Sequence, residues 1–228
     1  MIKPTKRPRV IANFALTADG KVSTRNLTPT GFTSKTDKRR LLEIRSLGDA
    51  VLAGARTVKT DRMSMRITAE DLRQRRSSLG KPPEPLRVIV SNRGAVETSW
   101  KVFQTPGAPI LVFSGARMSQ AARASIARSA DLWIFDTPEV NLAKMLQILR
   151  SDYQVRTLVC EGGPRLFRNL LEIGVVDELH LTWTPLIFGG MKAPTLIGVP
   201  DKFLPATIRC RLKDICVEGE ECFLTYSL

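Results

Sequence analysis

Metal ligands and disulfide patterns are scarce in this sequence. It has one histidine, His180, and four cysteines, and no two cysteines have the CxxC spacing of zinc or redox sites. Three of the cysteines, Cys210, Cys216 and Cys222, fall in the last nineteen residues. Because nothing else points to secretion, we expect reduced thiols, with disulfides as the alternative, and no metal site.

Long apolar runs are also absent. No stretch approaches the ~20 apolar residues that a membrane-spanning helix needs. The run from Val10 to Leu16 is too short for the hydrophobic part of a secretory signal. We therefore expect a cytoplasmic protein whose basic N-terminal tail, residues 1–8, leads into a first strand.

Two common catalytic fingerprints are missing as well. The sequence has neither the GxSxG motif of a nucleophilic serine nor the GxGxxG motif of the usual dinucleotide-binding fold. The single histidine lies in an alternating strand pattern, and we interpret it as structural. These absences argue against a Ser-His-Asp hydrolase and against a protein that binds a dinucleotide through the usual Rossmann motif.

Positive charge, in contrast, is abundant. The chain has a formal net charge of +13, and residues 1–60 alone hold thirteen Lys and Arg against four Asp and Glu. Such an excess favours anionic partners. Nucleic acid is one alternative, but the basic residues are scattered, only three Trp and two Tyr are available for stacking, and no nucleic-acid-binding motif is present. A small phosphorylated ligand explains part of the charge.

Short apolar runs alternate with helical patterns, which predicts an α/β fold in one domain over residues 1–228. The runs are nearly continuous in apolar residues, as in strands covered on both faces; they are Val10–Leu16, Asp49–Gly54, Leu86–Ser91, Ile110–Ser114, Asp131–Phe135, Thr157–Cys160 and Glu178–Thr184. Helices are expected over residues 34–47, 117–128, 140–150 and 164–173. Ser34 would cap the first of them, with Asp37 as the partner in a short capping box.

The last part of the chain changes character. Two alternating runs, Thr207–Ile215 and Glu221–Leu228, flank a turn at Gly219 and predict antiparallel strands that complete a mixed sheet. Residues 62–85 are polar and rich in Arg, Ser, Gly and Pro. We expect this segment to be a long excursion near the site.

Three turns at predicted strand ends carry polar residues. Asp19-Gly20 follows the first strand and is typical of a hairpin turn. After Gly54, the spacing of Thr57 and Asp61 places them on one face of a helical turn, although an ordinary capped helix is the alternative. Glu161 and two glycines end another strand just before a helix. Free amides at the start of that helix would bind a phosphate group.

Six segments in order along the chain resemble the pyrimidine reductase family of riboflavin biosynthesis, in its stand-alone form. They are Thr17–Lys21, Gly54–Asp61, Leu86–Ser91, Glu161–Pro164, Val176–Leu179, and Pro185–Gly190 together with Ala193–Leu196. Each segment is weak alone. Their shared order over almost the whole chain is specific.

The resemblance implies a dihydrofolate-reductase-like fold, with three αβα layers around a mixed, mostly parallel sheet. It also implies a homodimer that uses NADPH to convert the ribosyl group of a phosphoribosylamino-pyrimidine to a ribityl chain. The cofactor contacts that it implies are Ala15, Thr57, Asp61, Ser91, Asn92, Gly162, Gly163, Pro164, Arg165 and Leu166. The substrate contacts that it implies are Asn13, Pro29, Arg45, Met65, Arg66 and Glu161, with Glu161 and Asp61 as catalytic residues.

The sequence departs from this family in three ways. The family's arginine after the Thr-Asp turn is displaced, which leaves Arg66 as the candidate ligand of the substrate phosphate. Asn13 stands where many bifunctional members have lysine, and the zinc deaminase half of those members is missing. Three alternatives therefore stay open: a reductase of the same fold with a pterin or carbonyl substrate, a basic nucleic-acid-binding protein, and a catalytically silent relative.

Overall fold

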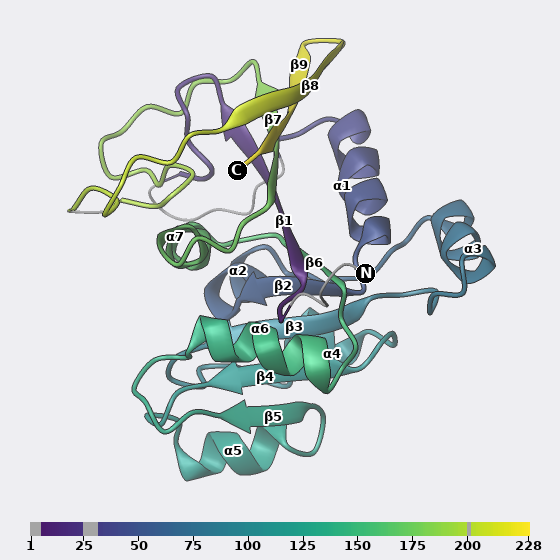
Figure 1. Cartoon of the computed structure of the whole chain (residues 1–228), viewed down its shortest axis with the longest axis vertical. Helices are drawn as coiled ribbons and strands as arrows, with labels where there is room; N and C mark the ends of the chain where they lie inside the picture. Colours follow the sequence, from purple (N-terminus) through teal and green to yellow (C-terminus); the bar gives the residue numbers. More distant parts are fainter. Residues whose placement is uncertain (1–5, 25–31, 200–201) are drawn as a thin grey trace.

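The computed structural model describes residues 6–24, 32–199 and 202–228. Within these ranges the chain forms a nine-stranded sheet with the order β5-β4-β3-β2-β6-β1-β7-β9-β8 (Figure 1). The strands from β5 to β7 in this order run parallel to their neighbours, whereas β9 is antiparallel to both β7 and β8. The strands are β1 (Arg9–Thr17), β2 (Ala50–Gly54), β3 (Leu86–Ser91), β4 (Ile110–Ser114), β5 (Asp131–Ile134), β6 (Thr157–Cys160), β7 (Glu178–Thr184), β8 (Arg211–Glu218) and β9 (Glu221–Ser227).

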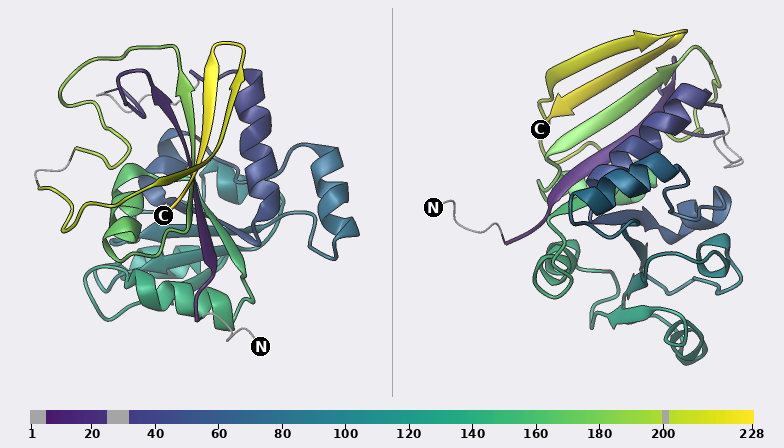
Figure 2. Two further views of the ribbon diagram at one scale, coloured as in Figure 1. Left: turned by 45° about the horizontal axis from the view of Figure 1, so that its top comes forward. Right: turned by 90° about the vertical axis from the view of Figure 1, so that its right-hand side faces the viewer.

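Helices cover both faces of the sheet (Figures 1 and 2). On one face lie α6 (Leu142–Ser151) and α7 (Pro164–Glu172). The other face carries α1 (Lys35–Leu47), α2 (Ala55–Thr60), α4 (Lys101–Gln104) and α5 (Gln120–Ile126), and α3 (Glu70–Ser78) packs beside α1. The predicted three-layer αβα class is therefore confirmed. None of the helices in the described ranges is long and apolar enough to span a membrane.

Strand alternation explains why the strand sequences are almost continuously apolar. Along β1, Val10, Ala12 and Phe14 face the layer of α6 and α7, whereas Ile11 packs with Ile44 of α1. The ring of Phe14 meets that of Phe167 in α7 at a centroid distance of 4.8 Å. Because both faces of these strands are largely buried, most side chains on both faces are apolar.

The seven strands predicted before the C-terminal hairpin are confirmed to within one residue at each end, and Glu178–Thr184 has the predicted bounds. The first helix also starts as predicted, since the Ser34 hydroxyl accepts a hydrogen bond from the Asp37 amide at 3.1 Å. The capping box is wrong, however. The Ser34 amide donates instead to Glu221 of β9, at 2.9 Å, and leaves the Asp37 carboxylate to other partners.

Several other local predictions need correction. The helix predicted over 117–128 begins only after its Ser119 cap, and β8 starts at Arg211 rather than Thr207. The Asp19-Gly20 turn forms without a hairpin, because the Asp19 carboxylate accepts the Gly189 amide at 2.8 Å and so holds the turn against a distant loop. The excursion over 62–85 contains the unpredicted helix α3.

The end of the basic N-terminal tail is held against the fold. Arg7 donates two hydrogen bonds to the Asp177 carboxylate, at 2.7 and 2.9 Å, and Asp177 also accepts the Val10 amide at 2.7 Å. Burial alone would raise the pKa of Asp177, but the hydrogen bonds from Arg7 and Val10 outweigh it and lower that pKa. This pair fixes where β1 begins.

The Arg76 side chain connects the end of α3 to two neighbouring segments of the chain. Its side chain is almost fully buried, with 2% of the residue exposed. Its Nε donates to the Pro82 carbonyl at 2.9 Å, and its Nη1 donates to the carbonyls of Ser46 and Gly48 at 2.7 and 2.6 Å. One buried side chain therefore satisfies carbonyl groups from two separate segments.

Replacing Arg76 by Ala is expected to lower the free energy of unfolding by about 3 kcal/mol, because buried carbonyls lose their donor and a cavity is left. Urea denaturation measures this loss. The neighbouring Arg75→Ala is the control, since Arg75 is exposed and its removal should change the free energy by less than about 0.5 kcal/mol. Equal effects of the two changes would show that the carbonyl contacts of Arg76 are unimportant.

Candidate active site

A large cleft opens at the carboxyl ends of the parallel strands. Its volume is about 1540 Å³, and its lining includes Ala15 of β1, Gly54 at the end of β2, Ser91 of β3 and Glu161 after β6. Ligand sites of open α/β sheets gather at this edge, because successive strand ends bring their loops together there. The cleft is larger than the ~300–1,000 Å³ of common ligand pockets, so it has room for two ligands side by side.

The turn after β6 and the start of α2 are in direct contact inside the cleft. The Gly54 amide donates to the Gly162 carbonyl at 2.8 Å. A Cβ on Gly163 would lie only 2.4 Å from the Thr57 hydroxyl oxygen, a distance that no side chain tolerates. Only glycine therefore fits at position 163, and the two turns that the sequence singled out lie side by side.

The first turn of α7 faces the cleft with free amides. The helix starts at Pro164 after the Gly163 cap, which has no side-chain hydrogen bond. Arg165 and Leu166 line the cleft in this first turn. Unpaired amides and the positive end of the helix dipole attract an anionic group. The Gly162–Gly163 peptide bond is cis, and Gly162 has φ +92°.

Asp61 lies beside this contact. Its amide donates to the Thr57 carbonyl at 2.9 Å, which closes the end of α2, and its carboxylate accepts the Thr60 hydroxyl at 3.3 Å. Burial raises the pKa of Asp61, and the hydrogen bond from Thr60 only partly offsets this. The carboxylate is thus protonated more readily than an exposed aspartate.

Glu161 forms a buried ion pair with Arg45 of α1. The Arg45 Nε and Nη2 donate to the two carboxylate oxygens at 2.6 and 2.7 Å, and only 9% of the Arg45 side chain and 4% of the Glu161 side chain are exposed. Burial alone would lower the pKa of Arg45, but the Glu161 charge outweighs burial and raises it. The Arg45 guanidinium therefore remains charged in the cleft wall, bound to the Glu161 carboxylate through two hydrogen bonds.

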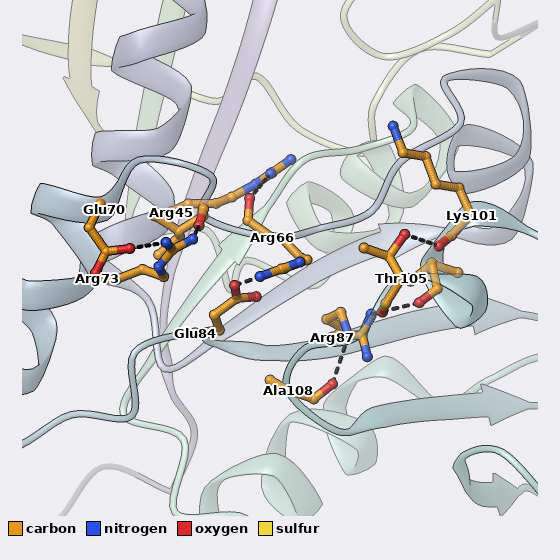
Figure 3. Close-up of polar contacts among 11 residues, drawn as sticks. Arg45, Arg66, Glu70, Arg73, Glu84, Arg87, Lys101, Thr105 and Ala108 are labelled. Atoms are coloured by element: carbon orange, nitrogen blue, oxygen red, sulfur yellow. Dashed lines mark hydrogen bonds and ion pairs between the residues drawn. The ribbon is translucent and has the colours of Figure 1, made fainter.

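The same guanidinium holds a third segment. The Arg45 Nη1 donates to the carbonyl of Arg66 at 2.5 Å (Figure 3). All three guanidinium nitrogens of Arg45 therefore donate hydrogen bonds within the protein. The structure gives Arg45 a positioning role toward Glu161, and its contact with the substrate stays a prediction.

Two predicted substrate residues do not reach the cleft. Met65 is fully buried in the apolar cluster with Val58, whereas its neighbours Met63 and Ser64 line the cleft. Arg66 turns the other way, and its Nε donates to Glu84 at 2.8 Å (Figure 3). Positive φ angles at Arg62 and Met65 redirect the side chains along this loop.

Most of the other predicted residues do line the cleft. They are Asn13, Ala15, Thr57, Asp61, Ser91, Asn92, Gly163, Pro164, Arg165 and Leu166. Asn92 is held in place because its side-chain oxygen accepts the Val140 amide at 3.1 Å. Gly162 does not line the cleft, and its carbonyl accepts the Gly54 amide. Pro29 lies outside the described residues.

The cleft lining also contains residues that the sequence did not single out. Ten Lys and Arg line it against five Asp and Glu, and every basic member except Arg45 is exposed. The acidic members include Asp37, near the start of α1. The sequence spacing could have indicated Asp37 as a cleft residue. Asp37, Leu41 and Arg45 are four residues apart and so share one helix face.

Two other titratable groups lie away from the cleft chemistry. His180 contacts Glu178 at 2.6 Å and does not line the cleft. Cys160 is fully buried, and burial raises the pKa of its thiol to about 12. Within the described ranges, no group of three or more His, Cys, Asp or Glu is placed to hold a metal ion.

The mixed sheet and the cleft at its edge define the class of α/β proteins with a dihydrofolate-reductase-like sheet. A structure of a pyrimidine reductase-like protein from Corynebacterium diphtheriae superposes with a TM-score of 0.83 at 23% identity, covering 96% of this chain and 91% of that one. The model of the RibD C-terminal domain matches residues 8–224. The chain belongs to the RibD C-terminal domain family.

Two archaeal relatives match over nearly their whole length. Both are named 2,5-diamino-6-ribosylamino-4(3H)-pyrimidinone 5′-phosphate reductase. The protein of Archaeoglobus fulgidus is 29% identical, covering 94% of this chain and 95% of the relative. That of Methanothermobacter thermautotrophicus is 28% identical, covering 97% of this chain and 99% of the relative.

The contact between Gly163 and Thr57 makes a specific prediction about paired substitutions. Gly163→Ala should destabilise the protein by about 2 kcal/mol, because the new methyl group collides with the Thr57 hydroxyl. Thr57→Ala removes that hydroxyl, so the double variant should recover most of the loss in a thermal unfolding measurement. A purely additive result would show that a methyl group at position 163 does not meet the Thr57 hydroxyl.

Proposed function

We propose that the chain is an NADPH-dependent reductase that converts the ribosyl group of a phosphoribosylamino-pyrimidine to a ribityl chain in riboflavin biosynthesis. The observation that carries this proposal is the contact of the Glu161–Gly163 turn with Gly54 and Thr57 in one cleft. The names of the two archaeal relatives give the substrate class.

The residues at one end of the cleft fit a dinucleotide. The first-turn amides of α7 suit the pyrophosphate, and the missing side chain at Gly163 lets backbone and ligand come close. Ala15, Ser91 and Asn92 complete the wall on the strand side. Asp61, with its raised pKa, would hold ribose hydroxyl groups beside Thr57.

The charge of the cleft supports NADPH over NADH. Arg56, Arg93, Lys101 and Arg117 are exposed and line the cleft beyond the ends of β2, β3 and β4. Guanidinium and ammonium groups at such a rim bind a phosphate monoester through charge-assisted hydrogen bonds. The extra 2′-phosphate of NADPH would supply that anion.

When bound, the reduced nicotinamide supplies a hydride to C1′ of the ring-opened ribosylamine. The protein must hold donor and acceptor carbons about 3–3.5 Å apart and exclude water. Ring opening breaks the C1′–O4′ bond, and a proton moves from the amine nitrogen to O4′. Glu161, fixed by Arg45, is placed to relay that proton, and a second proton then reaches the nitrogen as C1′ is reduced.

Two finer statements stay predictions. A homodimer would cover the apolar side chains of Trp183, Leu212, Ile215 and Val217, which are exposed on the β7 and β8 side of the sheet. Such contiguous exposed side chains are typical of protein interfaces. The expected cytoplasmic location also stays a prediction.

The direct test follows NADPH absorbance with purified protein and the phosphoribosylamino-pyrimidine, in its deaminated and undeaminated forms. We expect substrate-dependent oxidation of NADPH, and a kcat/KM at least about 10-fold lower with NADH, because the basic rim loses its phosphate partner. Oxidation with a pterin but with neither pyrimidine would overturn the proposed substrate. Binding of duplex DNA that weakens steeply with salt, without any reductase activity, would favour a nucleic-acid partner.

Replacing Glu161 by Gln tests the proton relay. Turnover should fall by about 100-fold, because an amide cannot accept and return the proton, whereas the dissociation constant for NADPH should stay within about 3-fold, measured by fluorescence titration. Glu43→Gln, on the exposed side of α1, is the control for loss of one carboxylate. Unchanged turnover in Glu161→Gln would remove Glu161 from the mechanism.

A further inference from the structure

Asp37 is a buried carboxylate in the cleft that the proposed hydride transfer does not use. Only 9% of the residue is exposed, yet it lines the cleft together with Asn13, Leu41 and Arg45. The cap of α1 does not need its side chain, because the Ser34 hydroxyl and the Glu221 carboxylate already hold the start of the helix. A buried acid that the helix cap does not use is a candidate for a role toward a ligand.

The partners of Asp37 are neutral donors. The hydroxyl groups of Thr182 in β7 and Thr33 are the neighbours that lower the pKa of its carboxylate. In the described part of the chain, no Lys or Arg forms an ion pair with it. A carboxylate has about four acceptor positions, so two remain for a ligand.

The surroundings of the Asp37 carboxylate favour a ligand that donates hydrogen bonds to it. Burial raises the pKa of Asp37, and the nearby Glu221 adds to that effect, while the two threonine hydroxyls and Arg40 oppose it. Arg40 itself lies over the Phe223 ring, 5.0 Å from its centroid. A ligand that brings N–H groups to Asp37 would relieve the cost of keeping its charge buried.

Asp37 also lies close to the strand wall of the cleft. Its partner Thr182 pairs in the sheet with Ala15, and Ala15 lines the cleft. Along α1, Asp37, Leu41 and Arg45 form one stripe that ends at Glu161. A flat ring on Leu41 would therefore have a carboxylate at one edge and the sugar-side residue Glu161 at the other.

We propose that Asp37 reads the base of the substrate, accepting hydrogen bonds from the 2-amino group and from N3–H of an undeaminated pyrimidinone. This inference rests on the proposed function. The two N–H groups are parallel and adjacent, so they match the two oxygens of one carboxylate. The deaminated ring presents a carbonyl at C2, and that oxygen would face a carboxylate oxygen. Asp37 thus selects the undeaminated compound by repulsion as well as attraction.

The test compares kcat/KM for the undeaminated compound and its 2-oxo counterpart in wild type and in Asp37→Asn. Wild type should prefer the 2-amino compound by at least about 10-fold. Asp37→Asn should lose about 100-fold on that compound and less than about 5-fold on the 2-oxo compound, which inverts the preference. The reason is that an asparagine amide offers one acceptor and one donor, which complement N3–H and the C2 carbonyl.

Two measurements separate this role from a loss of folding. The thermal midpoint of Asp37→Asn should not fall, because a buried charge is removed, and its dissociation constant for NADPH should stay within about 3-fold of wild type. Asp71→Asn is the matched control, since Asp71 is exposed on α3 and pairs only with Arg39 among the described residues. This control should leave the preference unchanged.

Equal losses of Asp37→Asn on both compounds, or a wild type that does not distinguish them, would overturn the role of Asp37. If wild type reduces neither compound, the proposed function is wrong. Calorimetric affinities of the two compounds for wild type and Asp37→Asn would then still decide whether Asp37 reads the base, because binding does not depend on turnover.

Discussion

The site depends on the buried ion pair between Arg45 and Glu161. It joins the last turn of α1 to the end of β6, and its remaining donor holds the loop at Arg66. Removing one partner would leave the other charge alone in the cleft wall, at a cost of several kcal/mol. Three segments that are far apart in the sequence are thus fixed at one point, next to the glycine turn that contacts Thr57.

The sequence was sufficient to predict this neighbourhood because of sheet topology. Parallel strands end at one edge, so Gly54 at the end of β2 and Glu161 after β6 are brought to the same side of the sheet. Side-chain direction within the following loop was not predictable. Arg62 and Met65 adopt positive φ without being glycine, and this sends Met65 into the core and Arg66 to Glu84.

Other misses have a common physical origin in long-range contacts. The helix α3 was missed because its buried face consists of Leu72 and Arg76, and a buried arginine has the same sequence pattern as a solvated one. The capping-box prediction for Asp37 was also wrong because of a contact with a residue far away in the sequence. Glu221, 187 residues from Ser34 along the chain, takes over that contact and releases the Asp37 carboxylate into the cleft.

The distribution of charge within the cleft divides recognition into two kinds. The basic residues, apart from Arg45, lie on the exposed rim, where salt screens them, so under the proposed function they would hold phosphate groups without strict geometry. Asp37 and Glu161 lie inside, where screening is weak and an unmatched oxygen or N–H group is costly. On the proposed function, affinity for phosphorylated ligands would therefore come from the rim, whereas discrimination between related bases and sugars would come from the few buried carboxylates.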